Sequence, residues 1–188
     1  MTFTGKTFLV SRPESGALFT EYDNHGAVVR HIGTLRPTGH EADRDLHYAL
    51  NVGIPLIDPA GGFYFVFQTG RPMFRRYDTS GALVYERHIE GLELDDRIRA
   101  LPTSWPRRTD ETGSLPLVLP LVRTAAVDPA GRLWVSLVVP FTYVYSRDGD
   151  KMRAVQFYAT GALSPSSLFF APRDRVLVTP GCYEFSTK

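Results

Sequence analysis

Residues 57–66 read IDPAGGFYFV, and residues 127–136 repeat this stretch as VDPAGRLWVS. A degenerate version, FFAPRDRVLV, occupies residues 169–178. A second signature, an aromatic residue followed by a polar turn that ends in glycine, occurs as YDNHG, YDTSG and YSRDG at 22–26, 77–81 and 145–149. Self-similarity over so long a period is typical of stacked β-sheet modules. The sequence therefore predicts a repeat architecture built from strands.

The turns between these strands contain the residues that their geometry requires. In the turn at 58–61, aspartate accepts local backbone hydrogen bonds, proline presets φ at the second position and glycine tolerates the fourth. The same reasoning applies to Asp23, Asp78 and Asp128, which begin turns that end in glycine. We interpret these aspartates as turn residues rather than as calcium ligands or catalytic groups.

Apolar and alternating runs on both sides of the turns predict four-stranded antiparallel meanders. The expected strands lie, module by module, at 7–11, 17–22 and 27–32; at 54–57, 63–68, 73–77 and 82–89; at 124–127, 133–138, 141–145 and 152–157; and at 167–170, 176–179 and 183–185. The first module is expected to lack its first strand and the last module its fourth. The prediction is one all-β domain over 1–188 with about 14 strands. Its modules cover about 6–33, 53–90, 122–160 and 164–186.

Such meanders are typical of the blades of β-propellers, which need about 4–8 blades to close a ring. The expected strands fall short of four whole blades, and an open ring exposes apolar faces and strand edges. Three interpretations remain open. The chain is the C-terminal part of a longer propeller, it completes a ring by self-association, or it forms a small or irregular β-structure.

The run VDPAGRLWV at 127–135, followed by YVYSRDG at 143–149, resembles a blade of the NHL/SMP-30-like six-bladed β-propellers. The resemblance extends from about Thr7 to Phe185 and implies a partial propeller of about three to four blades. It implies architecture rather than activity, because this fold hosts lactonases, lyases, receptors and scaffolds. It also implies that metal-dependent lactonases place carboxylate and asparagine ligands near the central channel. Ser167 and Thr179 lie at the corresponding places here, which argues against such catalysis.

Two long connections, at 33–53 and 90–122, interrupt the pattern. Both lead from a fourth strand to the next first strand, so we expect both on one face of the ring. Each contains a predicted short helix, at 41–50 and 94–101, with acidic residues in its first turn and Gly53 or Pro102 after its end. Loops of this length are often functional. A binding site is therefore expected under these two insertions.

The insertions contain the candidate site residues. The segment GHEADRDLH at 39–47 combines His40 and His47 with three carboxylates, a pattern suited to a metal or acid–base cluster, although a hydrated helix face explains it equally well. Trp105, Arg107 and Arg108 form a candidate platform for a carboxylate, sugar or peptide. The alternative is a tryptophan that packs the insertion onto the sheet beside two solvated arginines. These five residues are our predicted ligand-binding residues, and we predict no catalytic residue and no metal ligand.

Composition excludes several classes. The 21 basic and 20 acidic residues give a net charge of +1 without a basic stripe, so no nucleic-acid partner is expected. A single cysteine, Cys182, excludes an internal disulfide and a multi-cysteine metal site, and we interpret it as a packing residue. The first residues do not resemble a signal peptide, and the longest apolar stretch, at 133–145, is too short to span a bilayer. We therefore expect a soluble chain with no membrane partner, in a compartment that the sequence leaves open.

No glycine-rich phosphate-binding motif, dinucleotide fingerprint or G-x-S-x-G elbow is present, so no cofactor is expected. The strands expected to be innermost are apolar or small, which favours packing over chemistry in a central channel. The sequence thus favours a non-catalytic module that binds an unknown protein or small molecule through the face with the insertions. The alternative is a propeller hydrolase or lyase, of a lactonase-like or streptogramin-lyase-like kind, acting in the channel.

Overall fold

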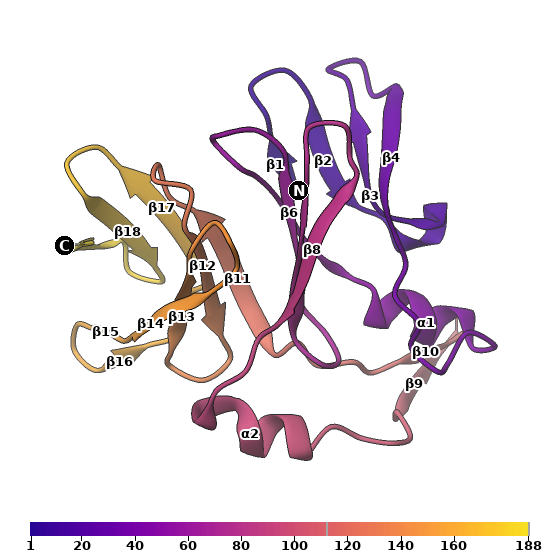
Figure 1. Ribbon diagram of the computed structural model, residues 1–188. Coiled ribbons are helices and arrows are strands. Elements are labelled where there is room, and N and C mark those ends of the chain that lie inside the picture. Colours follow the sequence, from indigo (N-terminus) through magenta and orange to yellow (C-terminus); the bar gives the residue numbers. More distant parts are fainter. Residues whose placement is uncertain (112, 188) are drawn as a thin grey trace.

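The computed structural model describes residues 1–111 and 113–187. Within them, antiparallel strands form four larger sheets and two small hairpins, accompanied by two α-helices (Figure 1). Neither helix is long and apolar enough to span a bilayer within this described part. The chain is thus mostly β-structure, as predicted.

Each larger sheet is a meander whose strands pair in chain order. The first sheet consists of β1 (Thr2–Phe3), β2 (Phe8–Ser11), β3 (Ala17–Tyr22) and β4 (Val28–Thr34), with a 3-10 turn, η1 (Pro13–Ser15), before β3. The second consists of β5 (Gly53–Ile57), β6 (Phe63–Phe67), β7 (Met73–Tyr77) and β8 (Leu83–His88). The third consists of β11 (Val122–Val127), β12 (Leu133–Leu137), β13 (Thr142–Tyr145) and β14 (Lys151–Val155). The fourth consists of β17 (Ser167–Ala171), β18 (Arg175–Thr179) and β19 (Tyr183–Ser186).

The remaining elements lie in the connections. The first insertion contains α1 (Arg44–Leu50), and the second contains α2 (Leu92–Arg99) followed by the hairpin β9 (Arg107–Asp110) and β10 (Gly113–Pro116). A further hairpin, β15 (Phe157–Tyr158) and β16 (Ala162–Leu163), precedes the fourth sheet. The fold-class prediction, four-stranded antiparallel meanders with two short helices in the insertions, is confirmed, and the predicted strand ends lie within two residues of the observed ones.

The first sheet corrects one prediction. β1 pairs with β2 through Thr2 opposite Leu9 and Phe3 opposite Phe8, so this sheet has the first strand that we expected it to lack. A strand of two residues is too short to show the alternation from which strands are recognised. The two hairpins were also not predicted: β15 and β16 are equally short, and β9 and β10 lack alternating apolar residues.

The helices begin at other residues than predicted. The Oδ1 atom of Asp43 accepts a hydrogen bond from the amide of Leu46 and caps α1, which therefore starts after Glu41. Glu41 instead uses its carboxylate to accept hydrogen bonds from the amides of Thr38 and Gly39, at 2.7 and 3.1 Å. The second helix, α2, starts two residues earlier than predicted and ends before Pro102.

The aspartates act as turn residues, as predicted. Asp58 accepts hydrogen bonds from the amide of Ala60 at its side chain and from the amide of Gly61 at its carbonyl. The same two contacts, one to the side chain and one to the carbonyl, recur at Asp23, Asp78 and Asp128. Gly61 has a φ of 102°, which only glycine adopts readily.

Apolar clusters fill the spaces between successive sheets. The strand β6 shows the principle, because all five of its residues are buried. Phe63, Phe65 and Phe67 belong to the cluster between the first and second sheets, whereas Tyr64 and Val66 belong to the cluster between the second and third. Strand alternation thus supplies both faces of a sheet with apolar side chains.

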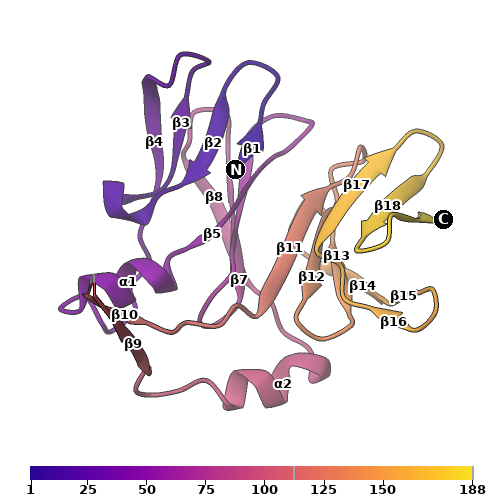
Figure 2. The ribbon, with the colours of Figure 1, turned by 180° about the vertical axis from the view of Figure 1, so that it is seen from behind.

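The four larger sheets stand side by side and are inclined to one another (Figures 1 and 2). Their first strands, β1, β5, β11 and β17, contact one another in this order. This arrangement is consistent with consecutive blades of a partial β-propeller.

A repeated hydrogen bond links each sheet to the next. Four residues after the turn glycine, the outermost strand carries a side chain that donates to a backbone carbonyl of the following sheet. The pairs are Arg30 with Thr79, Tyr85 with Arg147 and Arg153 with Thr187, at 2.9, 2.8 and 3.1 Å. The repeat is therefore expressed in contacts between sheets as well as in the sequence.

Candidate functional site

Both insertions lie at the same end of the sheets, at the bottom of Figure 1, as the sequence predicted. Between them and the second sheet is a pocket of about 390 Å³. Its walls include Arg36, Thr38 and His40 from the first insertion, Leu101, Pro102 and Trp105 from the second, and Arg71, Met73, Arg75, Glu86 and His88 from the second sheet and its β6–β7 loop. The pocket is thus built from three separate segments of the chain.

Arg36 is the residue on which this construction depends. Arg36 is buried, with only 8% of its surface exposed. Nη1 donates to the carbonyl of Arg71 at 2.7 Å, and Nη2 donates to the carbonyls of Leu50 and Thr69 at 2.7 and 2.6 Å. The guanidinium also lies 4.4 Å from the centre of the Phe67 ring. Arg36 therefore joins the end of α1, the β6–β7 loop and the start of the first insertion.

The pocket is electropositive. Arg36 has no carboxylate partner among the described residues, and burial, followed by the nearby charge of Arg75, lowers its pKa to about 10. Arg75 pairs with Glu86, with 2.5 Å between Nε and Oε2, and donates to the carbonyl of Thr34. The side chain of Arg71 is exposed and forms no ion pair within the described chain. Three arginines therefore face one glutamate.

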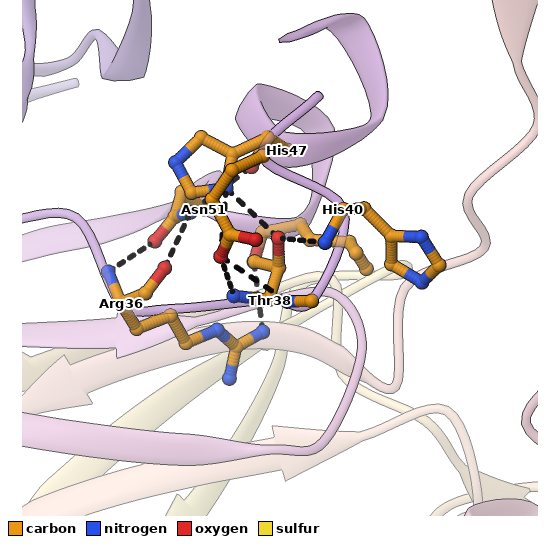
Figure 3. Close-up of polar contacts among 8 residues, drawn as sticks. Arg36, Thr38, His40, His47 and Asn51 are labelled. Carbon is orange, nitrogen blue, oxygen red and sulfur yellow. Dashed lines mark hydrogen bonds and ion pairs between the residues drawn. The ribbon is translucent and has the colours of Figure 1, made fainter. Parts of the chain in front are cut away.

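A polar network supports the wall that contains Thr38 (Figure 3). Thr38 Oγ1 and His47 Nδ1 lie 2.8 Å apart. Asn51 accepts a hydrogen bond from the amide of Arg36 at 2.9 Å and donates to the carbonyl of His47 at 3.0 Å. The ring of His40 points away from this network. His47 thus holds Thr38 in place, whereas His40 lines the pocket.

The structure does not bring the three residues of the predicted platform, Trp105, Arg107 and Arg108, together at one site. Trp105 is half-buried and lines the pocket, and its indole nitrogen has no hydrogen-bond partner in the part of the chain that is described. Arg107 points to α1, where it pairs with Asp43 at 2.7 Å and Asp45 at 3.5 Å. Arg108 is exposed on the hairpin and does not line the pocket.

Of the five predicted ligand-binding residues, the structure brings His40 and Trp105 together at the pocket. His47 and Arg107 instead stabilise the insertions, and Arg108 lies outside. Of the histidines and acids of 39–47, His47 and Glu41 approach each other, with 3.9 Å between Nδ1 and Oε1, but no group of three metal-ligating side chains occurs in the described residues. The arginines of the pocket were missed, because Arg36 and Arg75 become neighbours only through the fold.

The start of the second insertion is anchored to the third sheet. The hydroxyl of Tyr143 donates to Oε2 of Glu93 at 2.5 Å. Lys151 Nζ lies 3.3 Å from the centre of the Tyr143 ring and donates to the carbonyl of Glu90. A Cβ atom at Gly91 would collide with the Tyr143 hydroxyl, so glycine lets the chain pass this close. This anchor fixes α2, from which the chain continues to Trp105.

The anchor predicts a response to acid. The hydrogen bond from Tyr143 lowers the pKa of Glu93 from its usual value of 4.5. A lowered pKa in the folded state means that the stabilisation is complete above 4.5 and disappears as the pH falls through the shifted value. At about pH 3 we expect the amide hydrogens of α2 to exchange faster than the pH dependence of the intrinsic exchange rate explains. In Tyr143→Phe this additional acceleration should disappear. Amide hydrogen exchange measures both; the same acceleration in Tyr143→Phe would contradict the assignment.

Comparison with protein-family models gives no match, and comparison with curated proteins gives no relative.

Proposed function

We propose that this chain is part of an NHL/SMP-30-like β-propeller and acts as a non-catalytic binding module. Its ligand is a small molecule that enters the pocket between the two insertions. The observation that carries the proposal is the pocket itself, which both insertions and the second sheet build together. Concave sites with an apolar wall and a few fixed polar groups are where small molecules bind.

Binding is favoured over catalysis by the state of the polar groups. Thr38 and His47 are at the distance of a nucleophile and its base. However, the other ring nitrogen of His47 has no partner in the described residues that would orient the ring. Glu86 is paired with Arg75, so its carboxylate is already engaged. The first strands of the sheets contain mainly apolar and small side chains, with the exposed Arg123 of β11 as an exception, which gives no support to the alternative of a hydrolase or lyase in a central channel.

The proposal predicts that Trp105 is the aromatic anchor of the ligand. A library of small molecules titrated into 15N-labelled protein is expected to shift amide resonances within 36–40, 70–75 and 101–105. Trp105→Ala should weaken such binding about tenfold or more, because truncating a buried aromatic anchor costs about 2 kcal/mol.

Tyr158→Ala is the matched control, since Tyr158 is 60% exposed and lies outside the pocket. It should leave the dissociation constants unchanged. Shifts confined to other surfaces, or the same affinity in Trp105→Ala as in the original chain, would rule out this pocket as the binding site.

A further inference from the structure

We infer that the pocket selects organic anions, that is, molecules with a carboxylate or phosphate group on an apolar or aromatic body. This inference rests on the proposed function and adds the chemical class of the ligand. It is carried by the charge balance of the pocket, by unused donors on a buried guanidinium and by an apolar wall beside them.

The charge balance favours an anion. Three arginines and one glutamate line the pocket, and the glutamate already pairs with Arg75. Nearby acids are also engaged elsewhere. Asp43 and Asp45 pair with Arg107, and the carboxylate of Glu41 accepts hydrogen bonds from backbone amides. The carbonyl of Leu50, at the end of α1, offsets part of the charge of Arg36, but Arg71 has no such partner.

The buried guanidinium of Arg36 has N–H donors that no acceptor among the described residues uses. Arg36 has five N–H donors, of which three bind backbone carbonyls. Its Nε–H and the second hydrogen of Nη1 have no acceptor among the described residues. The three carbonyls and the Phe67 ring fix the plane of the group, so a ligand does not have to order it. Each of these two N–H groups can donate one charge-assisted hydrogen bond to a carboxylate or phosphate oxygen.

Most of the rest of the pocket wall is apolar, which favours a ligand whose anionic group is attached to an apolar body. Met73 and Leu50 are buried, and Pro102 and Trp105 close the side formed by the second insertion. Aromatic faces bind flat rings well, and they also tolerate aliphatic bodies. Inorganic anions alone would leave this wall unused.

Benzoate, benzamide and benzamidine test the inference, because they have nearly the same shape and differ in charge. We expect benzoate to shift the amide resonances around Arg36, Arg71 and Trp105, benzamide to bind at least about tenfold more weakly, and benzamidine not to bind. Phenyl phosphate added to the series separates the two anion types, since its affinity relative to benzoate shows which group the arginines prefer.

Arg71→Gln should weaken benzoate about tenfold while leaving benzamide unchanged. Its matched control is Arg123→Gln, an exposed arginine of β11 outside the pocket, which should change neither. Equal affinity for benzoate and benzamide, tighter binding of benzamidine, or no response of the pocket resonances to either anion would overturn the inference. The first two outcomes would leave the proposed pocket function intact. That function fails separately if no compound of the wider library binds at the pocket.

Discussion

Replacement of Arg36 by methionine is expected to lower the free energy of unfolding by about 3 kcal/mol or more. Methionine keeps the length of the side chain but has no donor for the buried carbonyls of Leu50 and Thr69 or for the part-buried carbonyl of Arg71. Each buried acceptor that loses its donor costs about 1–3 kcal/mol, and the three lie within one loop cluster. Urea denaturation followed by circular dichroism measures the change.

Arg71→Met provides the control. The Arg71 side chain is exposed and forms no hydrogen bond within the described chain, while the carbonyl that Arg36 needs is present in any residue. We expect its stability to stay within about 0.5 kcal/mol of the original chain. If the two variants unfold at the same urea concentration, Arg36 does not hold the insertion and the pocket lacks the support that we describe.

Asp58→Asn is expected to lower the free energy of unfolding by about 2–3 kcal/mol. Asp58 is buried, and its Oδ2 accepts hydrogen bonds from Arg76 at 2.8 Å and from Arg147 at 3.1 Å. Arg147 belongs to a turn of the third sheet, so this carboxylate joins the second sheet to the third. Asparagine retains the acceptor for the turn at Ala60 but removes the charge that two arginines share, and breaking a buried pair is strongly destabilising. Because the side chain of Arg147 is 45% exposed, we expect less than the full cost of a buried pair.

Asp78→Asn separates this link from the turn itself. Asp78 begins a turn of the same kind and accepts hydrogen bonds from the amides of Ser80 and Ala82, but it is exposed and joins no second sheet within the described residues. We expect a change within about 0.5 kcal/mol in thermal or urea unfolding. A loss at Asp58 no larger than the loss at Asp78 would mean that the carboxylate serves only its own turn.

The sequence sufficed for most of the sheets because strand alternation and turn chemistry are local. The runs at 17–22 and 73–77 coincide with β3 and β7, since their apolar spacing and the Asp and Gly residues around them define both ends. β1 and the hairpin at 107–116 were missed. The hairpin reads RRTD and GSLP, without alternating apolar residues, and it forms where the second insertion meets α1.

The site could be predicted only in part. The length and composition of the insertions pointed to the region in which the pocket lies, and His40 and Trp105 line that pocket. That the guanidinium groups of Arg36 and Arg75 both lie over the ring of Phe67 could not be predicted, because it depends on packing between distant segments. Arg107 was assigned to a ligand because its partners on α1 could not be known.

The contact between Arg107 and α1 makes the rim of the pocket sensitive to ionic strength. The pair between Arg107 and Asp43 holds the second insertion to the first, and both side chains are about one-third exposed or more, at 34% and 41%. Dissolved ions screen such partly exposed pairs, with a Debye length of about 8 Å under physiological conditions. Concentrated electrolyte therefore loosens the rim of the pocket and weakens its attraction for an anion at the same time, whereas dilute buffer strengthens both.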